Sequence, residues 1–149
     1  MTATWFNTPE RIDALLASAT SWLGTPFAGN SCAKGAGVSC HTLASAIYEE
    51  AGRGSFAVPE VPMSHARFSR DSILIRWMDG SPSFVRVTGE NVLPGDILGF
   101  KIGQCVHHVG VALPNGRFVH SIEGLGTVIS AMLDATWASR HAETWRSKP

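Results

Sequence analysis

The spacing of apolar residues changes halfway along the chain, and this change most constrains the fold. In the first half apolar residues recur at helical intervals, as in Ile12, Leu15, Ala19 and Trp22. In the second half short runs rich in β-branched and aromatic residues alternate with turns that contain Gly or Pro. Helical spacing followed by strand spacing predicts an α+β domain, with N-terminal helices packed on an antiparallel sheet.

Start and stop signals define the expected elements. We expect Thr8 to cap a first helix that ends at Gly24, and a second helix to run from about Cys40 to Gly52. Asp71 is expected to cap a third, short helix. The expected strands are the ranges 84–87, 97–102, 106–113, 117–122 and 127–132.

Composition narrows the class of protein. With 149 residues, 44% hydrophobic and 16% charged, the chain fits one domain spanning residues 1–149 with a buried core. Lys plus Arg and Asp plus Glu number 12 each, which argues against nucleic acid as the main partner. We see no signal peptide and no apolar run of about 18 residues, so no membrane span is expected. Three cysteines, an odd number, predict free thiols.

Cys40 is the candidate nucleophile. It lies at the expected N-terminus of the second helix, where backbone N–H groups and the helix dipole favour negative charge. A thiol there should lose its proton more easily, and the thiolate is the reactive form. The glycine-rich segment 34–37 before it lets a substrate approach closely. The alternative is that Cys40 is a small buried apolar residue, as most free cysteines are.

Two histidines can supply the base and its orienting partner. The strands 106–113 and 117–122 flank Pro114-Asn115-Gly116, which suits a three-residue hairpin loop built on a type I turn. That loop sets Leu113 opposite Arg117 and puts His108 and His120 on one face of the sheet. A two-residue Asn-Gly turn would instead put the two rings on opposite faces. We therefore predict His108 as the base and His120 as the residue that orients it.

A structural zinc site is the main alternative use of these residue types. Zinc-ligand residue types occur at Cys32, Cys40, Cys105, His107 and His108, but without the paired spacing of known zinc sites. We therefore expect no metal and no cofactor. His107 alternates to the other face from His108 and is expected to be a partly exposed strand residue.

Five segments, in this order, resemble the NlpC/P60 family of papain-like cell-wall endopeptidases. They are WLGTPF (22–27), GVSCHTL (37–43), PGDILGF (94–100), HVGVAL (108–113) and GRFVH (116–120). The resemblance implies a papain-like fold and a cysteine peptidase or amidase that hydrolyses amide bonds in peptidoglycan stem peptides through a Cys40–His108–His120 triad. The segment before Cys40 and the ending Trp137 to Trp145 resemble phage-type members, so phage tail proteins are expected partners and the location is cytoplasmic or virion-associated.

Three positions depart from the family's pattern, in which the nucleophile motif is usually Gly-x-Asp-Cys-Ser-Gly-Leu. Ser39 replaces the aspartate, Thr42 replaces the glycine, and Phe27 stands where a tyrosine often assists the oxyanion. Loss of one oxyanion donor can cost on the order of a hundredfold in rate. The backbone at Ser39 and Cys40, or the His41 ring, could take over, so Phe27, Ser39 and His41 are the candidate oxyanion and substrate-binding positions.

These departures leave two alternatives beside peptidoglycan hydrolysis. One is a deamidase or acyltransferase of the same architecture that acts on another substrate. The other is a non-catalytic phage tail assembly protein that retains the fold.

Overall fold

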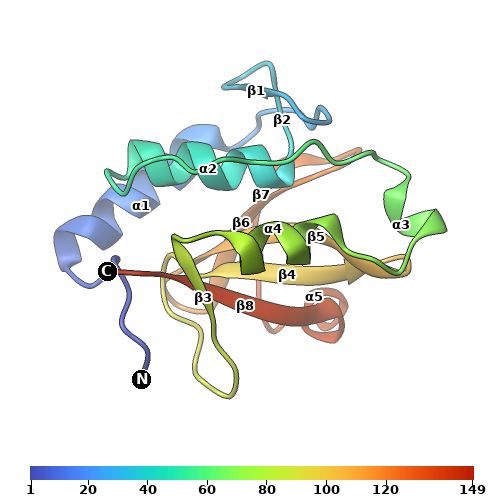
Figure 1. The fold of residues 1–149 in the computed structure, drawn as a ribbon. Coiled ribbons are helices and arrows are strands. Elements are labelled where there is room, and N and C mark those ends of the chain that lie inside the picture. Colours follow the sequence, from blue (N-terminus) through green and yellow to red (C-terminus); the bar gives the residue numbers. More distant parts are fainter.

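A six-stranded antiparallel sheet forms the centre of the structure, a computed structural model that describes residues 1–149 (Figure 1). Its strand order is β3-β8-β4-β5-β6-β7. The strands are β3 Phe84–Arg86, β4 Ile97–Ile102, β5 Cys105–Leu113, β6 Arg117–Ile122, β7 Gly126–Ala131 and β8 His141–Ser147. A separate two-stranded ribbon consists of β1 Cys32–Ala33 and β2 Gly37–Val38.

Helices come mainly from the first half of the chain, so the predicted α+β class is confirmed. They are α1 Pro9–Trp22, α2 Cys40–Glu50, α3 His65–Phe68, α4 Ile73–Gly80 and α5 Ala135–Arg140. Figure 1 shows α1 and α2 lying together on one side of the sheet. None of the helices has the length and apolar character needed to cross a lipid bilayer.

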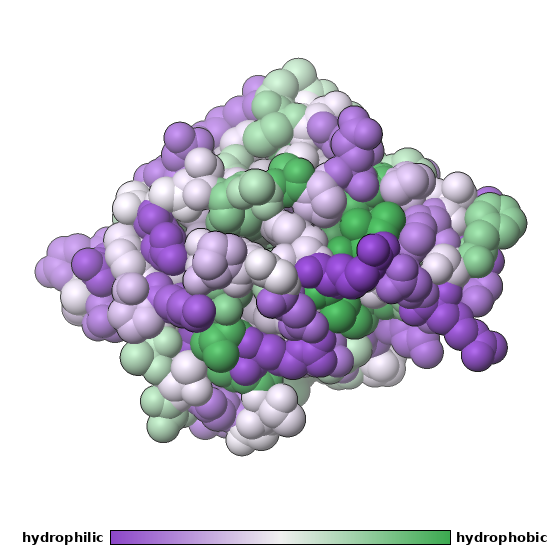
Figure 2. Space-filling view, in the orientation of Figure 1, coloured by the Kyte–Doolittle hydropathy of each residue, from purple (hydrophilic) through white to green (hydrophobic).

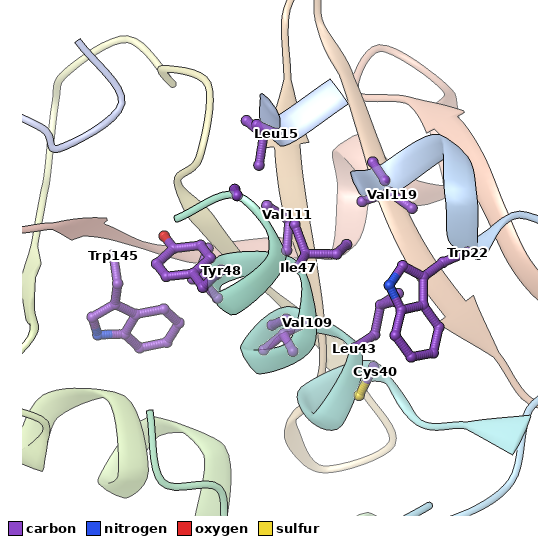
Figure 3. Close-up of a cluster of buried hydrophobic side chains, with 14 of the residues drawn as sticks. Leu15, Trp22, Cys40, Leu43, Ile47, Tyr48, Val109, Val111, Val119 and Trp145 are labelled. Atoms are coloured by element: carbon purple, nitrogen blue, oxygen red, sulfur yellow. The ribbon is translucent and has the colours of Figure 1, made fainter. Parts of the chain in front are cut away.

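The main core lies between these helices and one face of the sheet. Its side chains include Leu15 and Trp22 of α1, Leu43 and Ile47 of α2, and a set of strand valines, as Figure 3 shows. The strand valines are Val109, Val111 and Val119. Full burial of each such side chain contributes about 1.5–3 kcal/mol, so the core fixes α2 against β5 and β6.

A smaller apolar cluster covers the other face of the sheet, where α5 packs. It contains Leu98, Phe100, Ala112 and Phe118, with Trp137 of α5 against it. On the outside, Figure 2 shows polar residues over much of the visible face, with apolar residues in patches between them.

Helix caps show where the expected boundaries were right and where they were wrong. Thr8 caps α1, and its Oγ1 accepts a hydrogen bond of 3.2 Å from the N–H of Arg11. The cap of α4 is Ser72, because its Oγ accepts from the N–H of Ile75 at 3.0 Å. Asp71, the predicted cap, lies one residue too early and instead pairs with Arg76.

The C-terminal strand β8 was not predicted from the sequence. It lies between β3 and β4, and its Arg146 is completely buried. An arginine in a strand gives no signal of burial, since arginine is almost always exposed unless it is paired. The partner is Asp96, which follows the Pro94-Gly95 turn at the start of β4.

Candidate active site

The thiol of Cys40 lies at the first residue of α2, where the sequence placed it. Its side chain is 8% exposed. Thr42 fixes this end of the helix, because its Oγ1 accepts from the N–H of Ser39 at 3.0 Å and donates to the carbonyl of Ser31 at 2.5 Å. The threonine that replaces the family's usual glycine therefore stabilises the start of the helix that carries Cys40.

The β5–β6 hairpin brings His108 and His120 together. Leu113 pairs with Arg117, the register predicted from a three-residue loop. Nε2 of His108 lies 2.8 Å from Nδ1 of His120, within hydrogen-bond distance. The prediction that both rings lie on one face is therefore confirmed, while their catalytic roles stay a prediction.

The turn of this hairpin differs from the type I geometry that we expected. Asn115 and Gly116 both have positive φ, 65° and 70°. A type I turn would give Asn115 a negative φ. Because Asn tolerates the left-handed region better than most residues, the loop keeps its length with another backbone path.

Aromatic side chains enclose the two histidines. The Trp137 ring lies 4.7 Å from that of His120 and 5.4 Å from that of His108, measured between ring centres. Phe118 packs against His120 at 4.4 Å. These contacts restrict ring rotation, so the His108–His120 pair has a defined geometry.

Ser130 of β7 continues the hydrogen-bonded chain and was missed from the sequence. Its Oγ lies 2.8 Å from Nε2 of His120. No motif marks this residue, because its approach depends on the β6–β7 register, in which His120 is opposite Val128.

His41 is the side chain whose hydrogen-bonding atom faces the thiol. Nδ1 of His41 lies 4.0 Å from Sγ of Cys40, and Nε2 lies 3.1 Å from Oδ1 of Asn30. The same Oδ1 accepts from the N–H of Val61 at 2.9 Å, so it is an acceptor and Nε2 of His41 is the donor. Nδ1 of His41 is then an acceptor toward Cys40. Asn30, a second residue missed from the sequence, thus fixes the tautomer of His41.

Burial keeps the candidate nucleophile and the candidate base neutral. It raises the pKa of Cys40 to about 11, although backbone N–H groups of Val109, His41 and Cys40 itself act to lower it. It also lowers the pKa of His108 well below its usual value, with His120 adding a smaller effect. The expectation that the helix start would make Cys40 acidic is therefore wrong here, because loss of hydration outweighs the N–H groups.

Cys40 and His108 line the same cavity, of about 410 Å³. The hydrogen bonds of the site do not include one between Sγ of Cys40 and the His108 ring. Because Nε2 of His108 faces His120, Nδ1 is the nitrogen left for the thiol. Hydrogen bonds between catalytic groups are often loose without substrate, so this arrangement is compatible with the prediction that His108 is the base.

The predicted oxyanion and substrate-binding positions Phe27, Ser39 and His41 also line the cavity, but two of them offer limited chemistry. Phe27 forms one wall and has no donor. Ser39 is buried, and its Oγ is 2.9 Å from Oγ1 of Thr42, so its hydroxyl serves the helix start. Arg67 and Glu123 add one positive and one negative side chain to the lining.

No group of three or more His, Cys, Asp or Glu side chains is arranged to hold a metal ion. Of the five residues considered for zinc, Cys40, His107 and His108 line the cavity, whereas Cys32 and Cys105 do not. Cys32 is exposed beside α2, and Cys105 is buried at the start of β5.

The fold and the site together define a papain-like α+β domain with a cysteine at a helix N-terminus and two histidines on adjacent strands. Solved structures of the NlpC/P60 family share this fold. An NlpC/P60 family protein similar to a lipoprotein from Staphylococcus aureus has a TM-score of 0.70 at 18% identity, over 100% of this chain and 45% of that protein. The peptidoglycan hydrolase RipB from Mycobacterium tuberculosis has a TM-score of 0.58 at 17% identity, over 97% and 67%.

A curated relative is similar over part of the sequence. The murein DD-endopeptidase and LD-carboxypeptidase MepS from Escherichia coli is 35% identical over 60 residues. These residues cover 40% of this chain and 32% of MepS, about a third of that protein's length. No family model matches the chain. The resemblance to the NlpC/P60 family seen in five sequence segments is confirmed by these structural neighbours, which establish the fold.

Proposed function

We propose that this protein is a cysteine peptidase or amidase that hydrolyses amide bonds in peptidoglycan stem peptides. The observation that carries the proposal is the meeting of Cys40 and His108 in one cavity, with His108 hydrogen-bonded to His120. The peptidoglycan hydrolases that share the fold, and the partial match to MepS, support the same reaction and substrate class.

The proposed mechanism starts from a neutral pair. As Sγ of Cys40 attacks the amide carbonyl, its proton passes to Nδ1 of His108. The N–H groups at the start of α2 are the proposed donors to the developing oxyanion, since the helix dipole there favours negative charge. His108 then gives its proton to the leaving amine, and water hydrolyses the thioester. His120 holds the ring of His108 and accepts from its Nε2–H throughout.

The cavity suits a peptide that carries charges of both signs. Arg67 can hold a carboxylate, and Glu123 can hold an amine. Stem peptides contain both groups close to their amide bonds. His107, which is half-buried, also lines this cavity. Its Nε2–H donates to the carbonyl of Met63, so its Nδ1 can accept from a substrate N–H.

The test is hydrolysis of purified muropeptides, followed by chromatography and mass spectrometry. Cys40→Ala is expected to abolish product formation, and His108→Ala to lower kcat about 10²–10⁴-fold through loss of the base. Cys32→Ser is the matched control outside the cavity lining, and should keep the wild-type rate.

Two results would contradict the proposal. If Cys40→Ala cleaves as fast as wild type, the thiol is not the nucleophile. If wild type cleaves no muropeptide but releases ammonia or transfers an acyl group from other amides, a deamidase or acyltransferase replaces the proposal. An inert wild type in both assays would favour the non-catalytic assembly protein.

A further inference from the structure

Three side chains form a continuous chain of hydrogen bonds that starts at the candidate base. His108 of β5 contacts His120 of β6 at 2.8 Å, and His120 contacts Ser130 of β7 at 2.8 Å. His120 is completely buried and His108 is 6% exposed, whereas Ser130 is only partly buried. These hydrogen bonds therefore run from the cavity across strands β5, β6 and β7 to a hydroxyl near solvent.

We propose that Ser130 is a positioning residue whose Oγ accepts from Nε2–H of His120 and thereby fixes the tautomers of both histidines. This inference rests on the proposed function, because it assumes that His108 takes the proton of Cys40. Ser130 is not among the residues that line the cavity, and its side-chain hydrogen bond is to His120, so its effect reaches the reaction through His120.

The number of protons on each imidazole determines which atom donates in each of these hydrogen bonds. Each neutral imidazole carries one N–H and one acceptor nitrogen. If Nδ1 of His108 is to accept the thiol proton, the proton of His108 lies on Nε2 and is donated to Nδ1 of His120. The proton of His120 then lies on Nε2 and is donated to Oγ of Ser130. The hydroxyl hydrogen of Ser130 remains free to bond to solvent.

Donation in the opposite direction along these hydrogen bonds would prevent His108 from acting as the base. If Ser130 donated to His120, then Nδ1 of His120 would donate to Nε2 of His108. His108 would present an N–H to Cys40 and could not accept its proton. The hydroxyl of Ser130, near the surface, therefore decides whether the buried His108 can accept the proton of Cys40.

The environment of the rings favours a fixed neutral tautomer over a charged form. Burial lowers the pKa of His120 to about 4. His107 and Arg140 add positive charge near His108 and act in the same direction. When His108 becomes an imidazolium during the attack, its Nε2–H still donates to His120, and the Ser130 acceptor supports this arrangement.

The first test reads the tautomers directly, by ¹⁵N NMR of the imidazole nitrogens above pH 7, with signals assigned from His→Gln variants. In wild type we expect His108 and His120 both protonated at Nε2. In Ser130→Ala we expect a substantial fraction of both rings to move to the Nδ1–H form. Ser130→Thr keeps the hydroxyl and suits a strand, so it should restore the wild-type pattern.

The second test is steady-state kinetics on a cleaved muropeptide. Ser130→Ala should lower kcat roughly tenfold with KM little changed, since a hydrogen bond to a ring that becomes charged is lost. Ser130→Thr should recover kcat. A purely structural role would lower stability without moving the tautomers.

The outcomes separate this inference from the proposed function. Wild-type rings protonated at Nδ1, or tautomers unchanged in Ser130→Ala, would overturn the role of Ser130 even if muropeptides are cleaved. The expected tautomers in a protein that cleaves no muropeptide would support the hydrogen-bonded chain while removing the proposed substrate.

Discussion

Cys40 and His108 rest in their neutral forms because both lie in a site from which water is largely excluded. Burial raises the pKa of the thiol and lowers that of the imidazole, so both effects keep the proton on the sulfur of Cys40 in the resting protein. A neutral pair also limits unwanted oxidation or alkylation of the thiol, since the thiolate is the reactive form.

Alkylation of Cys40 is therefore predicted to be slow near neutral pH and to accelerate with rising pH. With a pKa of about 11, roughly a thousandth of the thiol is ionised at pH 8, and the rate should climb about tenfold per pH unit until that pKa is reached. Iodoacetamide kinetics, with mass spectrometry of each cysteine peptide, measures this.

The exposed thiol of Cys32 provides an internal reference in the same sample. A rate for Cys40 that stays high and flat below pH 8, and that falls in His108→Ala, would contradict the neutral pair. That result would show a thiolate–imidazolium pair in the resting protein.

Among the helices and strands, the start of α2 has the most influence on the site. Ser39 and Thr42, two of the departures from the family pattern, interact with each other through backbone and hydroxyl groups. Thr42 also donates to Ser31 in the segment before the helix. Ser39 and Thr42 thus form a local hydrogen-bonded cap that holds Cys40 in place.

Thr42→Val removes the hydroxyl with almost no change of shape. We expect the free energy of unfolding to fall by about 1–2 kcal/mol, because the N–H of Ser39 and the carbonyl of Ser31 lose a partner. Urea unfolding measures the loss. Thr136→Val, at an exposed position near the start of α5, is the control and should change stability by less than about 0.5 kcal/mol. Equal effects of the two substitutions would mean that the cap contributes little.

At the scale of the whole molecule, Arg146 joins the C-terminal strand to the N-terminal segment and to the turn before β4. Its guanidinium donates five hydrogen bonds, to both carboxylate oxygens of Asp96, to Glu90, and to the carbonyls of Thr2 and Asn91. The contact with Asp96 raises the pKa of Arg146, so the arginine stays charged inside the protein. The aspartate of the Pro-Gly-Asp segment therefore has a structural role.

Asp96→Asn is predicted to lower the free energy of unfolding by about 3–5 kcal/mol, since it leaves a buried guanidinium without its main counter-charge. Glu143→Gln removes an ion pair with Arg86, both partly exposed, and should cost less than about 1 kcal/mol. Urea unfolding of the two variants is the measurement. A cost for Asp96→Asn no larger than that of the control would refute this account of Arg146.

Local patterns in the sequence determined much of this protein. Helical spacing with a Thr8 cap gave α1, and the length of the loop at residues 114–116 placed His108 and His120 on one face. Both depend on contacts between residues close in the chain, where hydrogen-bond geometry leaves few alternatives.

Only the tertiary structure decided the features that depend on distant segments. Ser130 reaches His120 through the pairing of β6 with β7, Asn30 reaches His41 from a loop before α2, and Arg146 is buried because Asp96 lies beside it. The raised pKa of Cys40 also depends on distant segments of the chain. The helix dipole acts locally and can be read from the sequence, but the loss of hydration that outweighs it arises only when strands and helices from the whole chain close around the thiol.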